Sequence, residues 1–330
     1  MAITIIKPGI LDTLQDLGRY GYSHLGINPG GAMDRYAAQA ANLLVGNETP
    51  VAVLEMHFPA AQILFEHNAL ISITGADFCP MLNDEQVPRW HPVVVRKNTI
   101  LHFPKLQWGA RCYLAVHGGF CVPPWLNSYS TNLKAGAGGF AGRKLEKGDE
   151  LPFGENHMYI SGLLKEGKDY EILRWQVATG AMYEHPNEIY IIKGQEWDQL
   201  APQSQQDMLE NNFIIHPFSD RMGYQLKGVP LQRMQRNELL SSGVSFGTVQ
   251  LLPGGQMIVL MSDHQTTGGY PRLAHVISAH LPKLAQLRPS DCIQFKMTDI
   301  ATAENMLMAQ QQELNILRRA CYERLNQVVC

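Results

Sequence analysis

The chain has 330 residues and a formal net charge of −3, from 27 Lys+Arg against 30 Asp+Glu. The sequence contains no basic run, which argues against nucleic acid as the main partner, because phosphate binding needs clustered Lys and Arg. No apolar stretch approaches the ~20 residues of a membrane helix, and no signal peptide is visible after Met1. The six cysteines form no CxxC pair, which favours reduced thiols over a zinc site. We therefore expect a cytoplasmic protein that binds neither membrane nor nucleic acid.

The first half reads as short strands separated by turns. β-branched and aromatic residues between Gly, Pro and Asn predict strands. A helix is predicted from Asp34, its N-cap, to Val45, and Gly46-Asn47 ends it. The predicted strands lie within residues 62–75, 93–95, 100–103 and 112–116.

The second half starts again with a strand over residues 188–193 and a short helix over 204–210. The continuous apolar run 257–261 predicts a strand buried on both faces. From about Thr298 to Leu325 there is no Gly or Pro, and apolar residues recur at three- and four-residue steps, which predicts one amphipathic helix. That helix either packs on its own domain or offers a docking surface to a partner.

A chain of this length is expected to form two subdomains, because single cores stop growing near ~250–300 residues. Polar, Gly-bearing sequence between Gly148 and Lys168 marks the boundary. We predict a mainly β (α+β) fold with an N-terminal β-rich subdomain over 1–155. The second subdomain covers 156–330 and ends in the long helix.

Several common sites are not indicated. Gly136–Gly142 formally matches GxGxxA, but the next residues reach a turn at Gly148 instead of continuing a helix. The sequence has no Walker loop, no HxH or HExxH among its 12 histidines, and no GxSxG. We expect no metal site and no nucleotide loop in this chain.

Two candidate binding segments combine charge with glycine. The first, Gln15–Tyr22, holds Asp16, Arg19 and Gly21, and glycines let a ligand approach the backbone closely; it could instead be a surface turn with a local Asp16–Arg19 pair. The second, Ser219–Tyr224, holds Arg221, which could contact a carboxylate or phosphate with two prongs. Its alternative is a turn that leads into a strand.

The third segment, Asp263–Pro271, follows the buried strand directly and is the strongest candidate. Rigid scaffolds place ligand groups on polar loops that leave core strands. Asp263 could orient a substrate or accept a proton, and the amides of Gly268-Gly269 could form an anion-binding nest. A tight structural turn is the alternative. The other candidate substrate contacts in this loop are Gln265, Thr266, Thr267 and Tyr270.

These segments, with others, resemble the family of the C subunit of bacterial ATP-dependent 5-oxoprolinase. The family is also known as KipA-type antikinase-antagonist proteins, allophanate hydrolase subunit 2 and biotin-dependent carboxyltransferase domains. The resemblance runs from Gly9 to about Phe295 in family order. It rests on residues 13–19, 31–34, 41–47, 54–55, 73–76, 113–116, 118–119, 130–131, 220–224 and 263–271.

The resemblance implies cyclophilin-like β-barrel modules and ATP-driven opening of 5-oxoproline to glutamate. It implies two partners, one KipI-like and one LamB/YcsF-like, which are the B and A subunits of the complex, with this chain inactive alone. Phosphorylation of the unstrained lactam oxygen would make the ring carbon a better electrophile. In this reading Arg19 and Arg221 clamp anionic groups of a small acidic substrate, Asp263 orients it, and Gly268-Gly269 stabilise developing charge.

Two departures from the family pattern bear on the substrate. Gly30-Gly31 stands where Ser-Gly is usual, and Gln225 stands where Arg is usual. Two other family activities stay open: a biotin-dependent carboxyltransferase module, and a KipA-type regulator that binds a kinase inhibitor. No Met-Lys-Met biotinylation site occurs, so biotinyl-lysine would have to be on another chain.

Overall fold

The structure is a computed structural model and describes residues 1–154, 160–179, 181–235 and 239–329. Its contacts divide the chain into two compact units. Unit 1 comprises Met1–Gly18, Asp34–Thr179 and Gln312–Cys330, and unit 2 comprises Arg19–Met33 and Gly180–Gln311. Neither unit is therefore one continuous stretch of sequence. The boundary expected at 155/156 lies outside the described residues.

Unit 1 is built from two six-stranded sheets, in the orders β11-β1-β4-β9-β6-β7 and β12-β8-β5-β10-β3-β2. Alternating apolar side chains from both sheets meet in one buried core that includes Ile5, Phe65, Ile73 and Leu114. The strands are β1 (Ala2–Lys7), β2 (Thr13–Gln15), β3 (Val53–His57), β4 (Gln62–Phe65), β5 (Ala69–Asp77), β6 (Met81–Leu82), β7 (Glu85–Gln86), β8 (Pro92–Val95), β9 (Ile100–His102), β10 (Trp108–Val116), β11 (Glu150–Pro152) and β12 (Tyr170–Ile172).

Helix α1 (Arg35–Leu44) packs on this unit and starts as the sequence predicts. The side chain of Asp34 accepts a hydrogen bond from the Ala37 N–H at 2.9 Å, which caps the helix. The Asp34 N–H in turn donates to the Tyr113 hydroxyl at 2.8 Å, and that hydroxyl donates to buried Glu55 at 2.8 Å. Burial, with Glu55 as a second cause, raises the pKa of Tyr113, so its hydroxyl keeps the proton it donates.

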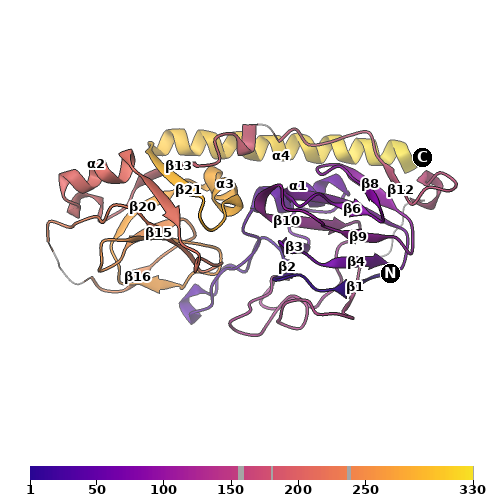
Figure 1. The fold of residues 1–330 in the computed structure, drawn as a ribbon, viewed down its shortest axis with the longest axis horizontal. Helices are drawn as coiled ribbons and strands as arrows, with labels where there is room; N and C mark the ends of the chain where they lie inside the picture. Colours follow the sequence, from indigo (N-terminus) through magenta and orange to yellow (C-terminus); the bar gives the residue numbers. More distant parts are fainter. Residues whose placement is uncertain (155–159, 180, 236–238, 330) are drawn as a thin grey trace. The chain divides into compact units, whose positions relative to one another are not determined.

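Unit 2 contains a closed seven-stranded barrel in the order β13-β20-β17-β18-β15-β14-β21 (Figure 1). Every pair is antiparallel except β13 with β21, which closes the barrel in parallel. Its strands are β13 (Glu188–Lys193), β14 (Asn212–Ile215), β15 (Gly223–Lys227), β17 (Thr248–Leu251), β18 (Met257–Leu260), β20 (Arg272–Val276) and β21 (Cys292–Met297). A separate two-stranded sheet joins β16 (Ser242–Gly243) to β19 (Thr267–Gly268).

The helices of unit 2 are few. They are α2 (Pro202–Glu210) and α3 (Leu281–Gln286), with short 3-10 turns η1 (Ser23–Leu25), η3 (Ala181–Tyr183), η4 (Trp197–Gln199) and η5 (Ser278–His280). Unit 1 adds η2 (Ile160–Leu163). The predicted mainly β fold with a barrel and few helices is confirmed, and the closed barrel is in unit 2. No helix of the described residues is long and apolar enough to cross a membrane.

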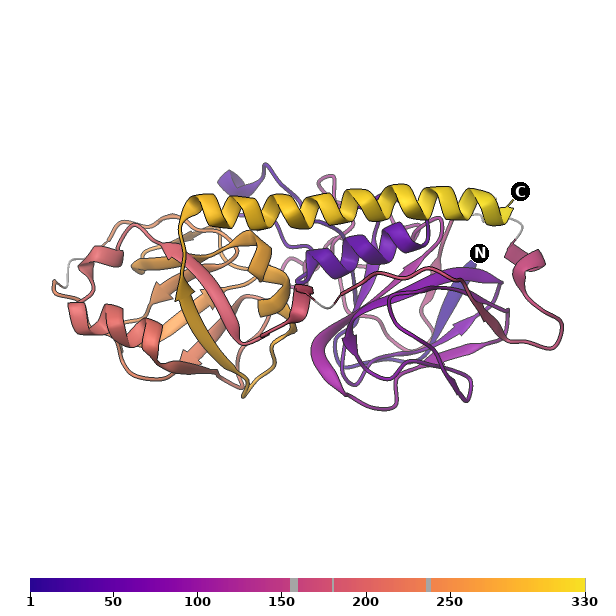
Figure 2. The same ribbon diagram turned by 90° about the horizontal axis from the view of Figure 1, so that it is seen from above.

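The long C-terminal helix α4 (Ile300–Val329) is also confirmed, and the contacts assign its first residues to unit 2 and the rest to unit 1 (Figure 2). Within unit 1, Leu314, Cys321 and Leu325 are buried. Within unit 2, the Gln310 side chain donates to the Ala279 carbonyl at 3.4 Å. Packing on the chain's own units thus accounts for part of its apolar face.

Asp12 in unit 1 provides a test of this packing. Burial raises the pKa of its carboxyl from 3.8 to about 7, and N–H donors from His57 and Gly9 oppose the rise only in part. The raised pKa means that this group stabilises the fold fully below pH ~4, and the contribution is lost as pH rises to about 7. We expect Asp12→Asn to flatten the pH dependence of the unfolding free energy over this window, by up to ~1.4 kcal/mol per pH unit. Urea unfolding of both proteins from pH 4 to 8 measures this; parallel profiles would contradict it.

Candidate functional site

Residues Arg19–Met33 form an arm that belongs to unit 2 by its contacts. The Arg19 N–H donates to the Pro29 carbonyl at 2.7 Å, so the two stems of the arm lie side by side. The tip is exposed and contains Gly21 and Gly26, both with positive φ, and a side chain at either position would meet open space. Arg19 itself is 1% exposed. The arm thus buries its charged residue and exposes its tip.

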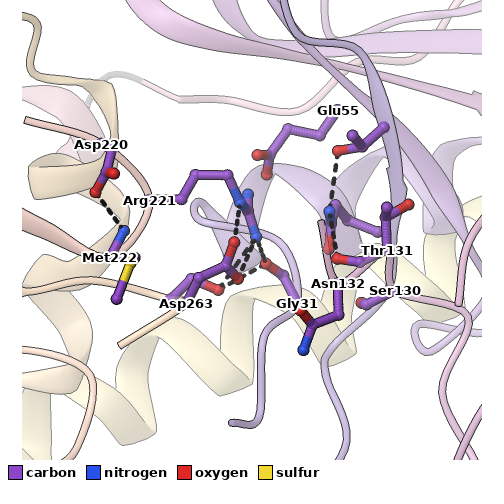
Figure 3. A network of polar contacts seen from close by, with 12 residues as sticks. Gly31, Glu55, Ser130, Thr131, Asn132, Asp220, Arg221, Met222 and Asp263 are labelled. Carbon is purple, nitrogen blue, oxygen red and sulfur yellow. Dashed lines mark hydrogen bonds and ion pairs between the residues drawn. The ribbon is translucent and has the colours of Figure 1, made fainter. Parts of the chain in front are cut away.

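Arg221 and Asp263 form a two-pronged ion pair in unit 2 (Figure 3). Arg221 Nε lies 2.8 Å from Asp263 Oδ2, and Nη2 lies 3.0 Å from Oδ1. The antiparallel pairing of Gly223 with Leu260 explains the contact, because it places the residues before β15 beside those after β18. The Asp263 N–H also donates to the Arg221 carbonyl at 2.7 Å. Such a paired geometry fixes the orientation of both side chains.

The arm is bonded to this ion pair. The Gly31 carbonyl accepts from Arg221 Nη2 at 2.8 Å and from Ser262 Oγ at 2.7 Å, as Figure 3 shows for Arg221. On the same arm, Asn28 Nδ2 donates to the Asp263 carbonyl at 2.8 Å. These three hydrogen bonds hold the second stem of the arm against the ends of β15 and β18.

Gly30 lies between the charged groups. Its φ is +61°, and a Cβ built there would be 3.1 Å from Arg19 Nη1 and 3.6 Å from Asp263 Oδ1. The Arg19 guanidinium and the Asp263 carboxylate therefore flank the same point of side-chain-free backbone. Two guanidinium groups and one carboxylate gather at this point, which suits a small molecule that carries both an acid group and a hydrogen-bond donor. Residues Arg19, Asn28, Gly30, Gly31, Arg221, Ser262 and Asp263 are called the arm cluster below.

The role expected for Arg221 changes with this geometry. Two of its guanidinium nitrogens are used by Asp263 and by Gly31, so it orients Asp263 and does not present both prongs to a ligand. Arg221 is 5% exposed and the Asp263 side chain 18%. Mutual neutralisation makes the burial of this pair tolerable, because an unpaired charge at such a depth is costly.

The rest of the 263–271 loop lies at other features of unit 2. Thr267 and Gly268 form β19, so this backbone is an extended ladder and not the nest expected from Gly268-Gly269. Gly269, Tyr270 and Pro271 line a cavity of about 690 Å³. His264, which the sequence did not single out, is 3% exposed, and its Nδ1 lies 2.5 Å from the Gln265 carbonyl. Gln265 is exposed and Thr266 is partly buried.

Asp16 and Gly21 are placed apart from one another in function. Asp16 belongs to unit 1, where its carboxylate accepts hydrogen bonds from the loop Ser128–Ser130. Gly21 is exposed at the tip of the arm. Gln225, where the family usually has Arg, is exposed on β15, so that departure changes the exterior of the barrel.

Sequence reasoning missed four members of the arm cluster: Asn28, Gly30, Gly31 and Ser262. Asn28-Pro29-Gly30-Gly31 contains the dipeptides that mark turns, but nothing in the sequence indicates that this turn meets Arg221. The predicted GxGxxA exclusion agrees with the fold, since Gly136–Gly142 lies in turns joined by the bridge Asn132↔Ala137. Among the described residues no group of three or more His, Cys, Asp or Glu could hold a metal ion.

Comparison with known proteins gives the family. Residues 25–297 match the family model for the carboxyltransferase domain, subdomain A and B. The chain belongs to this family. The C subunit of the Haemophilus influenzae 5-oxoprolinase is 36% identical over 312 residues, which cover 94% of this chain and 96% of that protein. The C subunit of the Escherichia coli 5-oxoprolinase is 35% identical over 98% of this chain and 99% of that protein.

A solved structure shows the same fold in a larger protein. The urea amidolyase of K. lactis matches with a TM-score of 0.84 and 26% identity, over 96% of this chain. The match covers only 20% of that chain. The family therefore occurs both as a separate chain of this length and as part of a much longer polypeptide.

Proposed function

We propose that this chain is the C subunit of an ATP-dependent 5-oxoprolinase, which opens 5-oxoproline to L-glutamate together with its KipI-like and LamB/YcsF-like partners. The observation that carries the proposal is the match to two 5-oxoprolinase C subunits over nearly the full length of both proteins in each comparison. The designation of those relatives as one lettered member of an enzyme supports action within a complex. The enzyme is then a hydrolase of a cyclic amide that is inactive without its partners.

The arm cluster suits this substrate. 5-Oxoproline carries a carboxylate, which the Arg19 guanidinium would bind, and a lactam N–H, which the Asp263 carboxylate would accept. Arg221 would hold Asp263 in the accepting orientation, and the bare backbone of Gly30-Gly31 would let the flat ring approach. The substrate is thus fixed at both its acid and its amide.

ATP enters as a co-substrate of the whole complex. Transfer of its terminal phosphoryl group to the lactam oxygen would weaken the amide, water would then add to the ring carbon, and phosphate would leave as the ring opens. We assign no ATP site to this chain, because Gly136–Gly142 has no helix after it to bind phosphates. The contribution of this chain is to bind and orient the acid.

The proposal is tested by assembling this chain with the KipI-like and LamB/YcsF-like proteins from the same source. We expect glutamate release from 5-oxoproline only when all three chains and ATP are present. If those two proteins turn over 5-oxoproline equally fast without this chain, the proposal is overturned. Hydrolysis of ATP without glutamate release would do the same.

A carboxyltransferase module is the second candidate, and the family model and the urea amidolyase fold favour it. In that reaction the arm cluster would hold an acceptor amide while a carboxyl group arrives on a biotin carried by another chain. Loss of labelled carboxyl group from a carboxylated biotin carrier, dependent on this chain and on an amide acceptor, would favour this activity over lactam opening.

A further inference from the structure

Asp16 was expected to contact substrate, yet its carboxylate is used inside unit 1. Oδ1 accepts from Ser128 Oγ at 2.8 Å, from Ser130 Oγ at 2.5 Å and from the Gly18 N–H at 2.7 Å. Oδ2 accepts from the Tyr129 N–H at 2.6 Å. Asp16 is 6% exposed. Four short donors leave this carboxylate poorly suited to take up a ligand as well.

The donors are themselves fixed. The Asp16 N–H donates to Ser130 Oγ at 2.9 Å, and the Ser130 N–H donates to Ser128 Oγ at 3.1 Å. One residue further along, Thr131 donates to the Leu14 carbonyl from both its N–H, at 2.9 Å, and its Oγ1, at 3.0 Å. The strand end at Leu14–Asp16 is therefore joined to residues 128–131 by a closed set of hydrogen bonds. Networks of this kind rigidify the backbone that carries them.

The network ends next to Arg19. Gly18, whose N–H it holds, has a φ of +95°, a conformation that glycine adopts without strain. The following residue begins the arm and carries the guanidinium that flanks Gly30. We propose that Asp16 is a positioning residue: its carboxylate fixes the turn at Gly18 and thereby places Arg19 in the arm cluster. This inference rests on the proposed function for its kinetic test only.

A double-mutant cycle tests the link in the assembled complex. We expect Asp16→Asn to lower kcat/KM for 5-oxoproline about 10- to 100-fold, because displacing a binding group by ~1 Å can cost ~100-fold. In an Arg19→Ala background the same change should cost less than about twofold, since the group it positions is gone. Losses that multiply would show that Asp16 acts independently of Arg19, and would overturn the inference.

A second readout does not use activity. Arg19 is buried, so trypsin should cut poorly after it in the unaltered chain. We expect Asp16→Asn to create cleavage after Arg19, detected by mass spectrometry as the fragment 1–19. The matched control is Asp12→Asn, another buried carboxylate of unit 1 that accepts backbone N–H groups. Equal resistance of both variants at Arg19 would overturn the inference, even if the complex has another activity.

A milder variant keeps the test informative if Asp16→Asn does not fold. Ser130→Ala removes one donor to Asp16, and Ser72→Ala removes a buried hydroxyl of the same unit that donates to the Ala41 carbonyl at 2.6 Å. We expect increased cleavage after Arg19 in Ser130→Ala and not in Ser72→Ala. The same cleavage rate in both would contradict the positioning role.

Discussion

Asp263→Asn is expected to lower the rate of glutamate release in the assembled complex by about 100- to 1000-fold. Charged groups aimed at the reacting part of a substrate contribute on this scale. The variant keeps the size of the side chain, but one oxygen that accepts from Arg221 at 2.8 or 3.0 Å becomes an NH2 group. The position that would accept the lactam N–H therefore loses both its charge and its fixed orientation. Unchanged turnover would remove Asp263 from the site.

The same substitution should also destabilise the fold. It leaves the Arg221 guanidinium, 5% exposed, without its carboxylate partner, and breaking a buried pair on one side costs about 3 kcal/mol or more. Glu196→Gln is the matched control, because Glu196 makes a similar two-pronged pair with Arg272 in unit 2, at 3.1 and 3.0 Å. We expect both variants to lose thermal stability, but only Asp263→Asn to lose activity at a temperature where both are folded.

Gly30→Ala is expected to lower kcat/KM for 5-oxoproline by about 10- to 100-fold. The new methyl group would lie 3.1 Å from Arg19 Nη1 and 3.6 Å from Asp263 Oδ1, so it would occupy the point that both groups flank. Arg19 would have to shift by a few tenths of an ångström, and the flat ring of the substrate would lose its approach to the backbone. Displacements of this size are enough to disturb a positioned site.

Gly26→Ala separates this effect from backbone strain. Gly26 is on the same arm and also has positive φ, at +76°, but a methyl group there meets nothing within 4 Å. Both variants should lose about 1 kcal/mol of stability from the left-handed backbone, measured by thermal unfolding. If Gly26→Ala reduces kcat/KM as much as Gly30→Ala does, the space beside Gly30 has no part in binding.

Local signals in the sequence predicted the elements well. Asp34 is the N-cap of α1 as expected, β13 has the predicted bounds, and the C-terminal helix is present. Those elements depend on caps, breakers and periodicity within a few residues. The two-unit division could be expected from length, but the membership of the arm in unit 2 could not, because it depends on contacts between residues about 190 to 235 positions apart.

The site followed the same rule. Arg19, Arg221 and Asp263 were all candidates by residue type, and the structure brings them around Gly30. Their roles could not be read from the sequence. Arg221 was expected to face a ligand, but the β15–β18 pairing turns it to Asp263, 42 residues later. Asp16 likewise has its donors more than 110 residues away.

The division of the chain also determines the order in which it can be completed during synthesis. Unit 2 needs residues 19–33, made early, and unit 1 needs residues 312–330, made last. A ribosome must therefore finish the polypeptide before the first unit acquires its full core. A fragment that ends near residue 155 would lack Leu314, Cys321 and Leu325, so no single cut can release either half intact.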